Sequence, residues 1–395
     1  MRSLNNLSIS LGGEHIGEDG ALRVKTRKYI SREFYENLRQ GKTYPGDVLL
    51  VKDGATTGKV AFLREGVEQP LAVNEHVFVI RPLEPATLDG AFAFYVLYSR
   101  IGQEQIRRHF HGLIGGVKRE NIQDVVIPLP PIPEQRAIAA ALRTVQNARD
   151  ARRRELEAER ERKAALMEDL FARGLRGGPQ KTTEIGTVPQ GWSVGPLAEG
   201  VSQTQYGLSV RGEQVGQYPI LRMNCLSDGK VSLSGLQYVD LSDKEFEAFR
   251  LRHGDLLFNR TNSADLVGKS GLFTADVECV FASYLVRVVV RPDKADPAFL
   301  NFYLNYAPTL TRLRGMAARG VSQANINASK LRTLLVPLPP LDEQRDIAEV
   351  LTACDAKIAA LEAEVALHDE LFRALLEELM SGRLSALPLV AEAAP

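Results

Sequence analysis

The sequence predicts an α+β fold in which two similar mixed α/β domains, related by a pseudo-twofold axis, are separated by two long helices that form an antiparallel coiled coil. The first observation behind this prediction is that the chain repeats itself at a spacing of about 209 residues. The second is that each repeat ends in a long stretch without proline, which carries the spacing of a helix. The third is that the two helices carry complementary charge. A chain of 395 residues is also too long for one ordinary core, which favours two or more domains.

The repeat consists of five landmarks that occur in the same order in both halves of the chain. The longest is Ile127-Pro-Leu-Pro-Pro-Ile-Pro-Glu-Gln-Arg136, which returns as Val336-Pro-Leu-Pro-Pro-Leu-Asp-Glu-Gln-Arg345. The other pairs are 46–50 with 254–258, Gly58-Lys59 with Gly268-Lys269, Arg81-Pro82 with Arg291-Pro292, and Phe94-Tyr95 with Phe302-Tyr303. The period is too long for a solenoid, so it indicates two copies of a domain-plus-helix unit. Two copies in one polypeptide predict the geometry of a twofold dimer.

Within each copy, the part before the proline-rich segment has short apolar runs separated by glycine, proline and asparagine. We predict strands over 48–51, 60–63, 77–80, 256–258 and 285–290. Helical spacing predicts one helix over 90–102 and one over 297–313.

After the proline-rich segment, each copy continues for about forty residues with the pattern of one helix of about 60 Å. The second helix, 342–380, repeats apolar residues at heptad spacing, which is typical of a coiled coil. Its predicted seam is Ile347, Leu351, Ile358, Leu361, Val365, Phe372, Leu375 and Leu379, with Cys354 and His368 between them. The seam of the first helix is Ile138, Leu142, Val145, Leu156, Leu166 and Leu170, with Arg149, Arg152, Glu159 and Lys163 as polar positions.

The net charge of zero conceals a segregation of charge along the chain. Residues 342–395 carry 4 basic and 12 acidic side chains, and the rest of the chain carries the compensating excess of basic ones. The first helix has a basic run, Arg152-Arg153-Arg154, with Arg149 one turn before it. Antiparallel pairing would place Arg149 near His368 and Arg152 near Val365. Exposed ion pairs add only about 0.2–1 kcal/mol each, so their main effect is on the choice of partner and register.

The composition excludes several classes of protein. No apolar run is long enough to span a bilayer, and Met1-Arg2-Ser3-Leu4 lacks the pattern of a signal peptide. The three cysteines, Cys225, Cys279 and Cys354, lie far apart without metal-ligand spacing. We therefore expect a cytoplasmic protein with no membrane segment, disulfide framework or metal site.

Several motifs invite a catalytic interpretation that their details do not support. The segment 54–60 is similar to a Walker A loop, but it has three residues between its glycines and Val60 where Ser or Thr would hold magnesium. The second copy has Ser263 in place of the first glycine. We predict that both are turns between strands, that Asp47 and Asp255 bond to backbone in their own turns, and that 133–135 and 342–344 begin helices. The sequence also lacks the Asn/Asp-Pro-Pro-aromatic loop of an adenine methyltransferase.

Taken together, the chain resembles the specificity subunits of type I restriction-modification enzymes. The resemblance rests on the paired segments Leu129–Arg136 and Leu338–Arg345, on the two Gly-Asp-x-Leu strands with a downstream Gly-Lys, and on the alternation of domain and helix. It covers essentially the whole chain. It implies target recognition domains at 1–132 and 179–335, and spacer helices at 133–178 and 336–395. By the repeat offset, Met1 aligns with Val210, so the first domain starts about twenty residues later than the second relative to the pattern.

The resemblance also implies the function and the partners. Each domain would read one half of a bipartite site in double-stranded DNA, and the helices would set the spacer and dock two modification (methyltransferase) subunits. Those subunits would bind S-adenosylmethionine and methylate adenine. Restriction subunits would add ATP- and Mg²⁺-dependent translocation and cleavage in defence against phage. The chain itself would be non-catalytic and would carry no cofactor.

Arg, Lys, Asn and Gln on loops are the expected DNA-contacting residues, because bidentate groups read base edges and cations bind phosphates. The candidates in the first domain are Lys25, Arg27, Lys28, Lys52, Thr56, Thr57, Lys59, Arg107, Arg108, Lys118 and Arg119. The candidates in the second domain are Gln205, Tyr206, Arg222, Asn224, Asn259, Arg260, Thr261, Asn262, Lys269, Arg312, Arg314, Arg319, Gln323 and Asn325. For the run at 149–154, pairing with the acidic helix, a solvated face and contact with phosphates all remain open.

Two other functions remain as alternatives. The chain could be a coiled-coil scaffold with two protein-binding heads and no role on DNA, or it could itself be a methyltransferase or nuclease. DNA binding with steep salt dependence, reconstituted with a modification subunit, would argue against the scaffold. Cofactor binding by the isolated chain would favour the enzyme.

Overall fold

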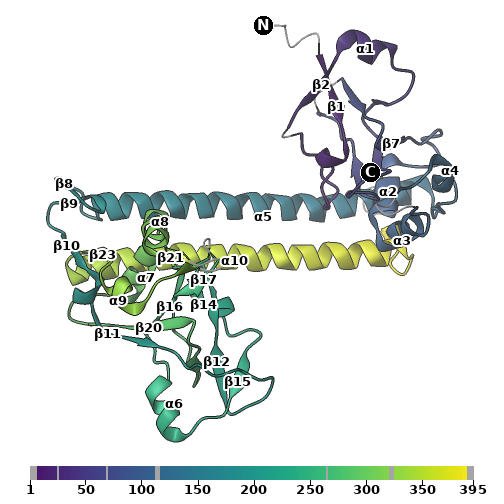
Figure 1. Cartoon of the computed structure of the whole chain (residues 1–395). Helices are drawn as coiled ribbons and strands as arrows, with labels where there is room; N and C mark the ends of the chain where they lie inside the picture. Colours follow the sequence, from purple (N-terminus) through teal and green to yellow (C-terminus); the bar gives the residue numbers. More distant parts are fainter. Residues whose placement is uncertain are drawn as a thin grey trace. The chain divides into compact units, whose positions relative to one another are not determined.

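The structure is a computed structural model that describes residues 7–24, 26–67, 70–111, 116–263, 266–319 and 324–388. The chain divides into two compact units. Unit 1 is Met1–Arg154 with Glu362–Pro395, and unit 2 is Glu155–Leu361. Each unit contains a globular domain, about half of helix α5 (Ile132–Arg173) and about half of helix α10 (Leu341–Met380) (Figure 1).

The globular domain of unit 1 is built on two small sheets. The first sheet has the order β2 (Lys28–Ser31), β1 (Leu7–Leu11), β6 (Leu71–Val73), β3 (Lys42–Thr43). The second has the order β5 (Val60–Phe62), β4 (Val48–Val51), β7 (Val77–Ile80). The helices are η2 (Gly13–His15), α1 (Arg32–Asn37), α2 (Gly90–Tyr98), α3 (Arg100–Arg108) and α4 (Arg119–Ile122).

Strand β4 explains why this domain has two cores. Its four residues are all apolar and all fully buried, as expected for a strand covered on both faces. Val48 and Leu50 face the core that contains α2, and Leu49 and Val51 face a second core under β1 and β6.

The globular domain of unit 2 has a larger set of strands. The main sheet has the order β11 (Val201–Tyr206), β20 (Leu285–Val290), β16 (Leu256–Asn259), β18 (Ser270–Leu272), β14 (Gly229–Val231), β13 (Leu226–Ser227). Two three-stranded sheets have the orders β15 (Gln237–Val239), β12 (Tyr218–Leu221), β19 (Val280–Phe281) and β17 (Thr261–Asn262), β22 (Ala324–Asn325), β21 (Ala318–Arg319). Two pairs are β10 (Ser193–Pro196) with β23 (Leu335–Leu338) and β8 (Gln180–Thr183) with β9 (Gly186–Pro189). The helices are η3 (Leu197–Glu199), η4 (Met223–Cys225), α6 (Asp243–Phe249), α7 (Pro297–Asn305), α8 (Ala307–Met316) and α9 (Ala328–Arg332).

The two domains share one plan. Strand β16 lies antiparallel between β18 and β20, as β4 lies between β5 and β7. Strand β12 pairs parallel with β19 and antiparallel with β15, as β1 pairs with β6 and β2. In unit 2, β11 additionally lies along β20. The duplication predicted from the sequence is therefore present in the fold, together with the predicted strands.

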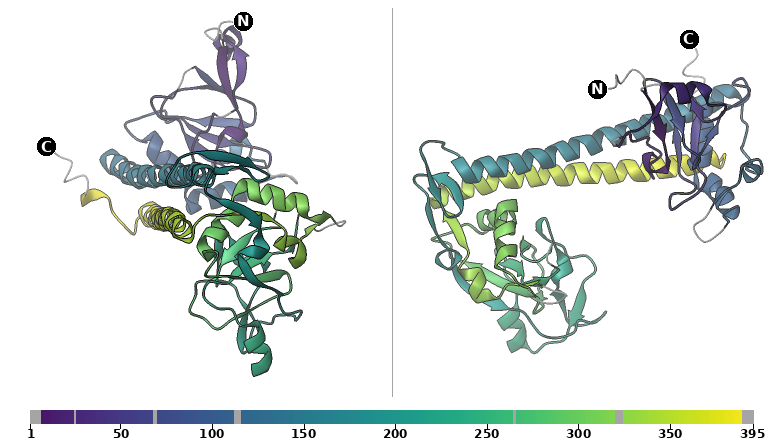
Figure 2. Two further views of the ribbon diagram at one scale, coloured as in Figure 1. Left: turned by 90° about the vertical axis from the view of Figure 1, so that its left-hand side faces the viewer. Right: turned by 45° about the horizontal axis from the view of Figure 1, so that its top comes forward.

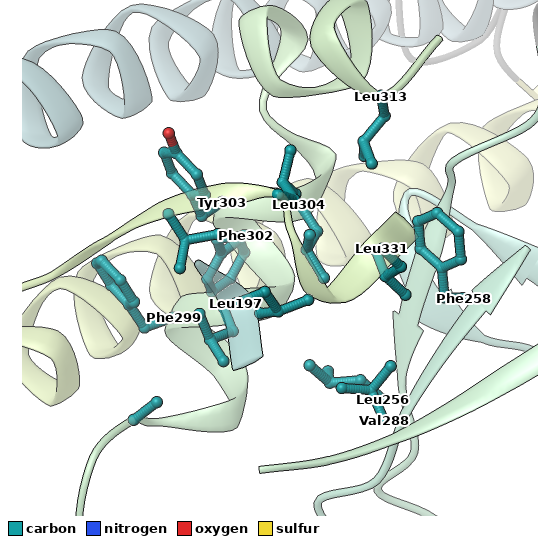
Figure 3. Close-up of a cluster of buried hydrophobic side chains, with 14 of the residues drawn as sticks. Leu197, Leu256, Phe258, Val288, Phe299, Phe302, Tyr303, Leu304, Leu313 and Leu331 are labelled. Atoms are coloured by element: carbon teal, nitrogen blue, oxygen red, sulfur yellow. The ribbon is translucent and has the colours of Figure 1, made fainter. Parts of the chain in front are cut away.

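The core of unit 2 joins the domain to the long helices. Phe299 and Tyr303 of α7 belong to one buried cluster with Leu256, Phe258 and Val288 of the sheet, and Figure 3 shows these side chains on both sides of α7. Phe171, near the end of α5, packs edge-to-face against Phe299 and Tyr303, with ring centroids 5.7 and 5.1 Å away. The helix end is thus part of the domain core.

The prediction of a single helix over 90–102 and of another over 297–313 was wrong. Each is divided in two by a residue with extended backbone, Ser99 in unit 1 and Tyr306 in unit 2. The Ser99 hydroxyl accepts a hydrogen bond from the Gly102 backbone N–H, so serine caps a new helix instead of continuing the old one. In unit 2, Pro308 lies in the first turn after Tyr306, a position that proline favours.

The repeated Glu-Gln-Arg motif fastens each long helix to its domain through the glutamine. Gln344 is fully buried, accepts a hydrogen bond from Asp296 N (2.8 Å), and donates to the carbonyls of Lys294 (3.0 Å) and Pro339 (2.9 Å). Asp296 in turn caps α7 through its side chain. We call this arrangement the glutamine clamp.

Unit 1 repeats the glutamine clamp. Gln135 accepts from Asp89 N (2.9 Å) and donates to the carbonyls of Thr87 (2.9 Å) and Pro130 (2.8 Å), and Asp89 caps α2. The motif is therefore more than the helix start predicted from the sequence. It joins the proline-rich segment, the long helix and the first turn of a domain helix.

The long helices pair in antiparallel fashion within each unit. In unit 1, Ile138 and Leu142 of α5 share a core with Phe372 and Leu379 of α10, and these stretches run side by side in Figures 1 and 2. In unit 2, Met167 and Leu170 share a core with Ile347 and Leu351. All fourteen apolar residues predicted for the seam are buried or half-buried. Among the polar seam positions, Arg149 and Glu159 are buried, whereas Arg152 is exposed.

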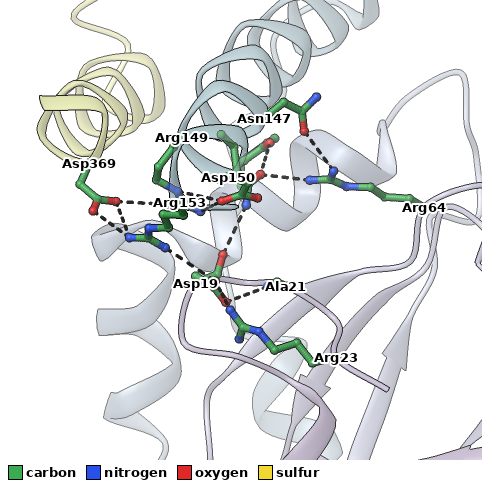
Figure 4. A network of polar contacts seen from close by, with 11 residues as sticks. Asp19, Ala21, Arg23, Arg64, Asn147, Arg149, Asp150, Arg153 and Asp369 are labelled. Carbon is green, nitrogen blue, oxygen red and sulfur yellow. Dashed lines mark hydrogen bonds and ion pairs between the residues drawn. The ribbon is translucent and has the colours of Figure 1, made fainter. Parts of the chain in front are cut away.

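Ion pairs link the basic and acidic helices. In unit 1, Asp369 accepts from Arg153 at 2.7 Å and lies 3.5 Å from Arg149 (Figure 4). The Arg149 guanidinium also lies 5.3 Å from the centroid of the Phe372 ring. Arg152 pairs with Glu364 at 2.9 Å. In unit 2, Lys163 pairs with Asp355 at 2.5 Å. For these arginines of the basic run, pairing with the acidic helix is the interpretation that the structure supports.

Candidate nucleic-acid interface

Residues from four separate segments of unit 2 meet around the Arg260 side chain. Its guanidinium donates to the Ser283 carbonyl (3.2 Å) and to Asn325 Oδ1 (3.4 Å), and it lies over the Tyr206 ring, 4.8 Å from the centroid. The Asn325 amide donates to Thr261 Oγ1 (2.6 Å), which orients its oxygen toward Arg260. We call Tyr206, Arg260, Thr261 and Asn325 the Arg260 cluster.

The Arg260 cluster holds a half-buried cation in a fixed direction. The Tyr206 hydroxyl accepts a hydrogen bond from Ala328 N, so the ring under the guanidinium is itself held in place. Within the described part of the chain, Arg260 Nε and the neighbouring Asn259 Oδ1 are buried without a hydrogen-bond partner. Arg260 Nη1 and Nη2 each donate one hydrogen bond to the protein and each carry a second N–H. An oriented guanidinium with such N–H groups can bind phosphate or a guanine edge, because its planar fork matches both. These four residues were predicted as separate candidates from the sequence, and the structure brings them together.

In unit 1 the candidate cations are spread over several loops. Lys28 pairs with Glu14 (2.5 Å), Lys59 with Glu18 (3.5 Å), and Lys118 with Glu120 (3.7 Å). The exposed candidates Arg107 and Arg108 lie in the last turn of α3, Arg119 begins α4, and Arg27 lies before β2. Lys52 lies next to the segment of Lys118, because Val117 N donates to the Lys52 carbonyl at 2.7 Å.

Some predicted residues have side chains with structural partners. Arg312 donates to the Leu335 carbonyl (3.0 Å) and the Tyr303 hydroxyl (2.7 Å), and Gln205 donates to the Ala248 carbonyl (3.0 Å). The Thr57 hydroxyl donates to Gly54 O within its own turn. The remaining candidates are half-buried Thr56, Arg222, Asn262, Lys269 and Arg314, and exposed Asn224. Lys25, Gln323 and the Arg319 side chain lie outside the described residues.

The two loops similar to a Walker A motif are turns between strands, as predicted. Gly58 and Gly268 have φ of 88° and 93°, which glycine tolerates best, and β5 or β18 follows. No helix N-terminus is therefore formed there for a phosphate.

The two aspartates of the Gly-Asp-x-Leu strands bond to backbone, which confirms the prediction. Asp47 accepts from Tyr44 N (2.7 Å) and Asp255 from Arg252 N (2.8 Å). Asp47 also pairs with Arg81 at 2.6 Å, and this raises the pKa of Arg81. Burial raises the pKa of Asp255 and lowers that of Arg287, which lies 3.8 Å from it.

Ser283, Tyr284 and His76 are not among the residues predicted from the sequence. Ser283 contributes its carbonyl to the Arg260 cluster, and exposed Tyr284 follows it at the start of β20. His76 occupies the matching place before β7. The pairing of β7 with β4 and of β20 with β16 relates His76 to Tyr284. The landmarks on either side, Gly58 with Gly268 and Arg81 with Arg291, are two residues further apart, so comparing landmarks alone did not reveal this equivalence. In the described ranges, no group of His, Cys, Asp or Glu could hold a metal ion, and no helix is long and apolar enough to cross a membrane.

Comparison with known families decides what this duplicated architecture is. The sequence profile of the type I restriction modification DNA specificity domain matches residues 16–159 and 207–366, one match in each copy of the repeat. The chain belongs to the specificity subunits of type I restriction-modification systems. This membership confirms the resemblance inferred from the repeated motifs.

Individual relatives agree with this membership. The chain is 24% identical over 388 residues to the EcoBI specificity subunit of Escherichia coli, covering 92% of this chain and 78% of that one. It is 24% identical over 348 residues to the MjaVIII specificity subunit of Methanocaldococcus jannaschii, covering 86% and 79%. A protein of the same archaeon, named for the MjaX restriction enzyme, is 30% identical over 206 residues, 51% of this chain and about half (48%) of that relative.

Solved structures show the same fold. A type I system S subunit from M. genitalium superposes with a TM-score of 0.60 at 14% identity, covering 95% of this chain and 93% of that one. A chain from a structural study of type I system assembly and conformational transition superposes with a TM-score of 0.55 at 18% identity, covering 96% and 92%.

Proposed function

We propose that this specificity subunit reads a bipartite site in double-stranded DNA. The domain within residues 1–132 reads one half-site and the domain within 179–335 reads the other. The helices of 133–178 and 336–395 set the gap between the half-sites. The observation that carries this proposal is the duplicated attachment, because Gln135 and Gln344 fasten two equivalent domains to two antiparallel helices in the same way. Rigid attachment is what a fixed spacing between two reading domains requires.

The Arg260 cluster is the proposed centre of recognition in unit 2. Its guanidinium is oriented by Ser283, Asn325 and Tyr206, and Nη1 and Nη2 each carry a second N–H beyond the one bonded to Ser283 or Asn325. We propose that these second N–H groups donate to acceptors on the DNA. In unit 1 we propose that Lys52, Lys118 and Arg119 act at the corresponding surface, with Arg107 and Arg108 contacting phosphates. Phosphate contacts of this kind would give affinity and salt dependence, and base contacts would give sequence preference.

The proposal assigns all chemistry to other subunits. Two modification subunits dock on the helices, bind S-adenosylmethionine and methylate adenine in each half-site. Restriction subunits use ATP and Mg²⁺ for translocation and cleavage. The missing methyltransferase motif in this sequence supports this division, and the complex is proposed to act in the cytoplasm.

The test is to reconstitute the chain with its modification subunits and to map methylated adenines across a genome by sequencing. We expect a motif with two specified halves and an unspecified gap. Arg260→Ala should weaken methylation through one half-site by roughly 5- to 150-fold, which corresponds to the 1–3 kcal/mol of a good bidentate base contact. Lys244→Ala, which removes an exposed cation from α6, is the matched control and should leave the motif unchanged.

Two outcomes would contradict the proposal. One is a contiguous motif without a gap. The other is a motif that stays unchanged when residues 179–335 are replaced by the matching segment of another specificity subunit. The second result would favour the scaffold alternative, in which the heads bind proteins only.

A further inference from the structure

A pair of backbone hydrogen bonds, which we call the junction, recurs in both units directly after the central strand, β4 in unit 1 and β16 in unit 2. In unit 2, Arg260 N donates to the Tyr284 carbonyl (3.1 Å) and Ile326 N donates to the Arg260 carbonyl (2.8 Å). In unit 1, Lys52 N donates to the His76 carbonyl (2.9 Å) and Val117 N donates to the Lys52 carbonyl (2.7 Å). Both bonds of the junction are therefore conserved between the two copies of the repeat in this chain.

The strands around the junction also correspond. Thr261 pairs antiparallel with Asn325, and Asp53 forms the equivalent bridge with Gly116. On the other side of the junction, Gly268 N donates to Asn259 O in unit 2 and Gly58 N donates to Val51 O in unit 1, both at 2.9 Å. The two units thus present the same frame, and Tyr284 and His76 occupy one equivalent position in it.

The side chain at this position is an exposed ring in both units. Tyr284 is 46% exposed and the His76 side chain is 53% exposed. Each ring is presented from a defined point, because its backbone carbonyl is bonded to the backbone N–H of a cationic residue, Arg260 or Lys52. An exposed tyrosine or histidine ring can stack its face on a base or form a hydrogen bond through its polar edge. This position therefore suits a surface that binds nucleic acid.

The chemistry around the ring differs between the two units. In unit 2, Arg260, whose backbone N–H is bonded to the Tyr284 carbonyl, donates through its guanidinium to Asn325 Oδ1. In unit 1, Asp53 Oδ1 lies 2.5 Å from His76 Nδ1 and Asp53 Oδ2 lies 3.6 Å from Lys52 Nζ. A carboxylate accepts from donors such as the cytosine amino group, whereas a guanidinium donates to guanine. The same frame therefore carries a carboxylate in unit 1 and a guanidinium in unit 2.

We infer that Tyr284 and His76 are equivalent specificity-determining residues, each contacting bases of the half-site that its own domain reads. This inference rests on the proposed function, because it needs DNA at the Arg260 cluster and at the matching surface of unit 1.

The experiment compares Tyr284→Ala, Tyr284→Phe and His76→Ala in the complete complex with modification subunits, with methylated motifs mapped by sequencing. Tyr284→Ala should reduce methylation or relax base preference on the order of tenfold at one or two positions of one half-site. His76→Ala should do so only in the other half-site, so each variant is the other's control. Tyr284→Phe keeps the ring and should retain preference that depends on the ring face, while losing preference that depends on the hydroxyl. Tyr29→Ala removes a ring that is 42% exposed on β2 and should change neither half.

The inference is overturned if Tyr284→Ala and His76→Ala both leave motif and methylation rates at wild-type values. It is also overturned if either variant, folded and bound to modification subunits, alters both halves equally. Replacement of residues 179–335 distinguishes a failure of this inference from a failure of the proposed function. If that replacement changes one half-site but the ring variants do not, the inference alone fails. If the replacement changes nothing, the proposed function fails as well.

Discussion

The glutamine clamp predicts a measurable loss of stability when a single buried amide is removed. In unit 2, Gln344→Ala would leave Asp296 N–H and the carbonyls of Lys294 and Pro339 without their partner. Gln344 is fully buried, so water cannot easily replace it. Each lost bond costs about 1 kcal/mol, and unsatisfied buried groups cost somewhat more, so we expect unfolding free energy to fall by about 2–4 kcal/mol.

The chain provides a specific probe for this loss. Trp192 is the only tryptophan in the sequence, it is buried in unit 2, and its Nε1 donates to Glu343 Oε2 at 3.0 Å. Its fluorescence during urea unfolding therefore reports on unit 2. Gln344→Ala should shift this transition to lower urea, and Gln135→Ala in unit 1 should shift it less.

Gln214→Ala is the matched control, since it removes an exposed glutamine from the same unit. It should unfold at the wild-type urea concentration. The reasoning is refuted if Gln344→Ala and Gln214→Ala unfold at the same concentration. It is also refuted if Gln135→Ala lowers the urea concentration of the Trp192 fluorescence transition as much as Gln344→Ala does.

Two further predictions concern unit 2. Lys163 and Asp355 are 2.5 Å apart with side chains 17% and 18% exposed, so Asp355→Lys should lower the unfolding free energy of unit 2 by about 1–3 kcal/mol. The double variant Lys163→Asp with Asp355→Lys should recover most of this free energy in the same fluorescence assay. No recovery would mean that the pair does not set the register of the two helices. Burial raises the pKa of Cys279 to about 12, and Cys225 and Cys354 are buried too. Native protein should therefore react with a thiol reagent at pH 8 far more slowly than urea-unfolded protein. Rapid labelling of Cys279 in the native protein would show that the core around it opens.

The parts of the fold that follow from periodic patterns could be predicted from the sequence. The repeat, the two long helices and their seam depend on spacing along the chain, which the sequence displays directly. The division of the helices at Ser99 and Tyr306 could not be predicted as easily, because it depends on one capping side chain and one proline against an otherwise continuous apolar pattern. Local capping there outweighs helical periodicity.

The site was predictable as residue types but not as an arrangement. Arg260, Asn325 and Tyr206 were named from their chemistry, yet their meeting depends on pairing between β17 and β22, which are short and far apart in sequence. Arg312 has the same chemistry, but its guanidinium is bonded to Leu335 and Tyr303. Sequence alone does not show which groups a guanidinium meets in the fold, Ser283 and Asn325 for Arg260 but Leu335 and Tyr303 for Arg312.

The proposed reading of DNA depends on the helices acting as a spacer, and insertion of one heptad into each helix tests this directly. Seven residues placed after Arg154 and after Leu361 keep the seam register and fall between the Arg152–Glu364 pair and the Glu159–Lys357 pair. The insertion lengthens each helix by about 10 Å. At about 3.4 Å per base pair, methylation mapping should then show a gap longer by about three base pairs with both half-sites unchanged. An unchanged gap, in a variant that folds and still methylates DNA, would contradict the account.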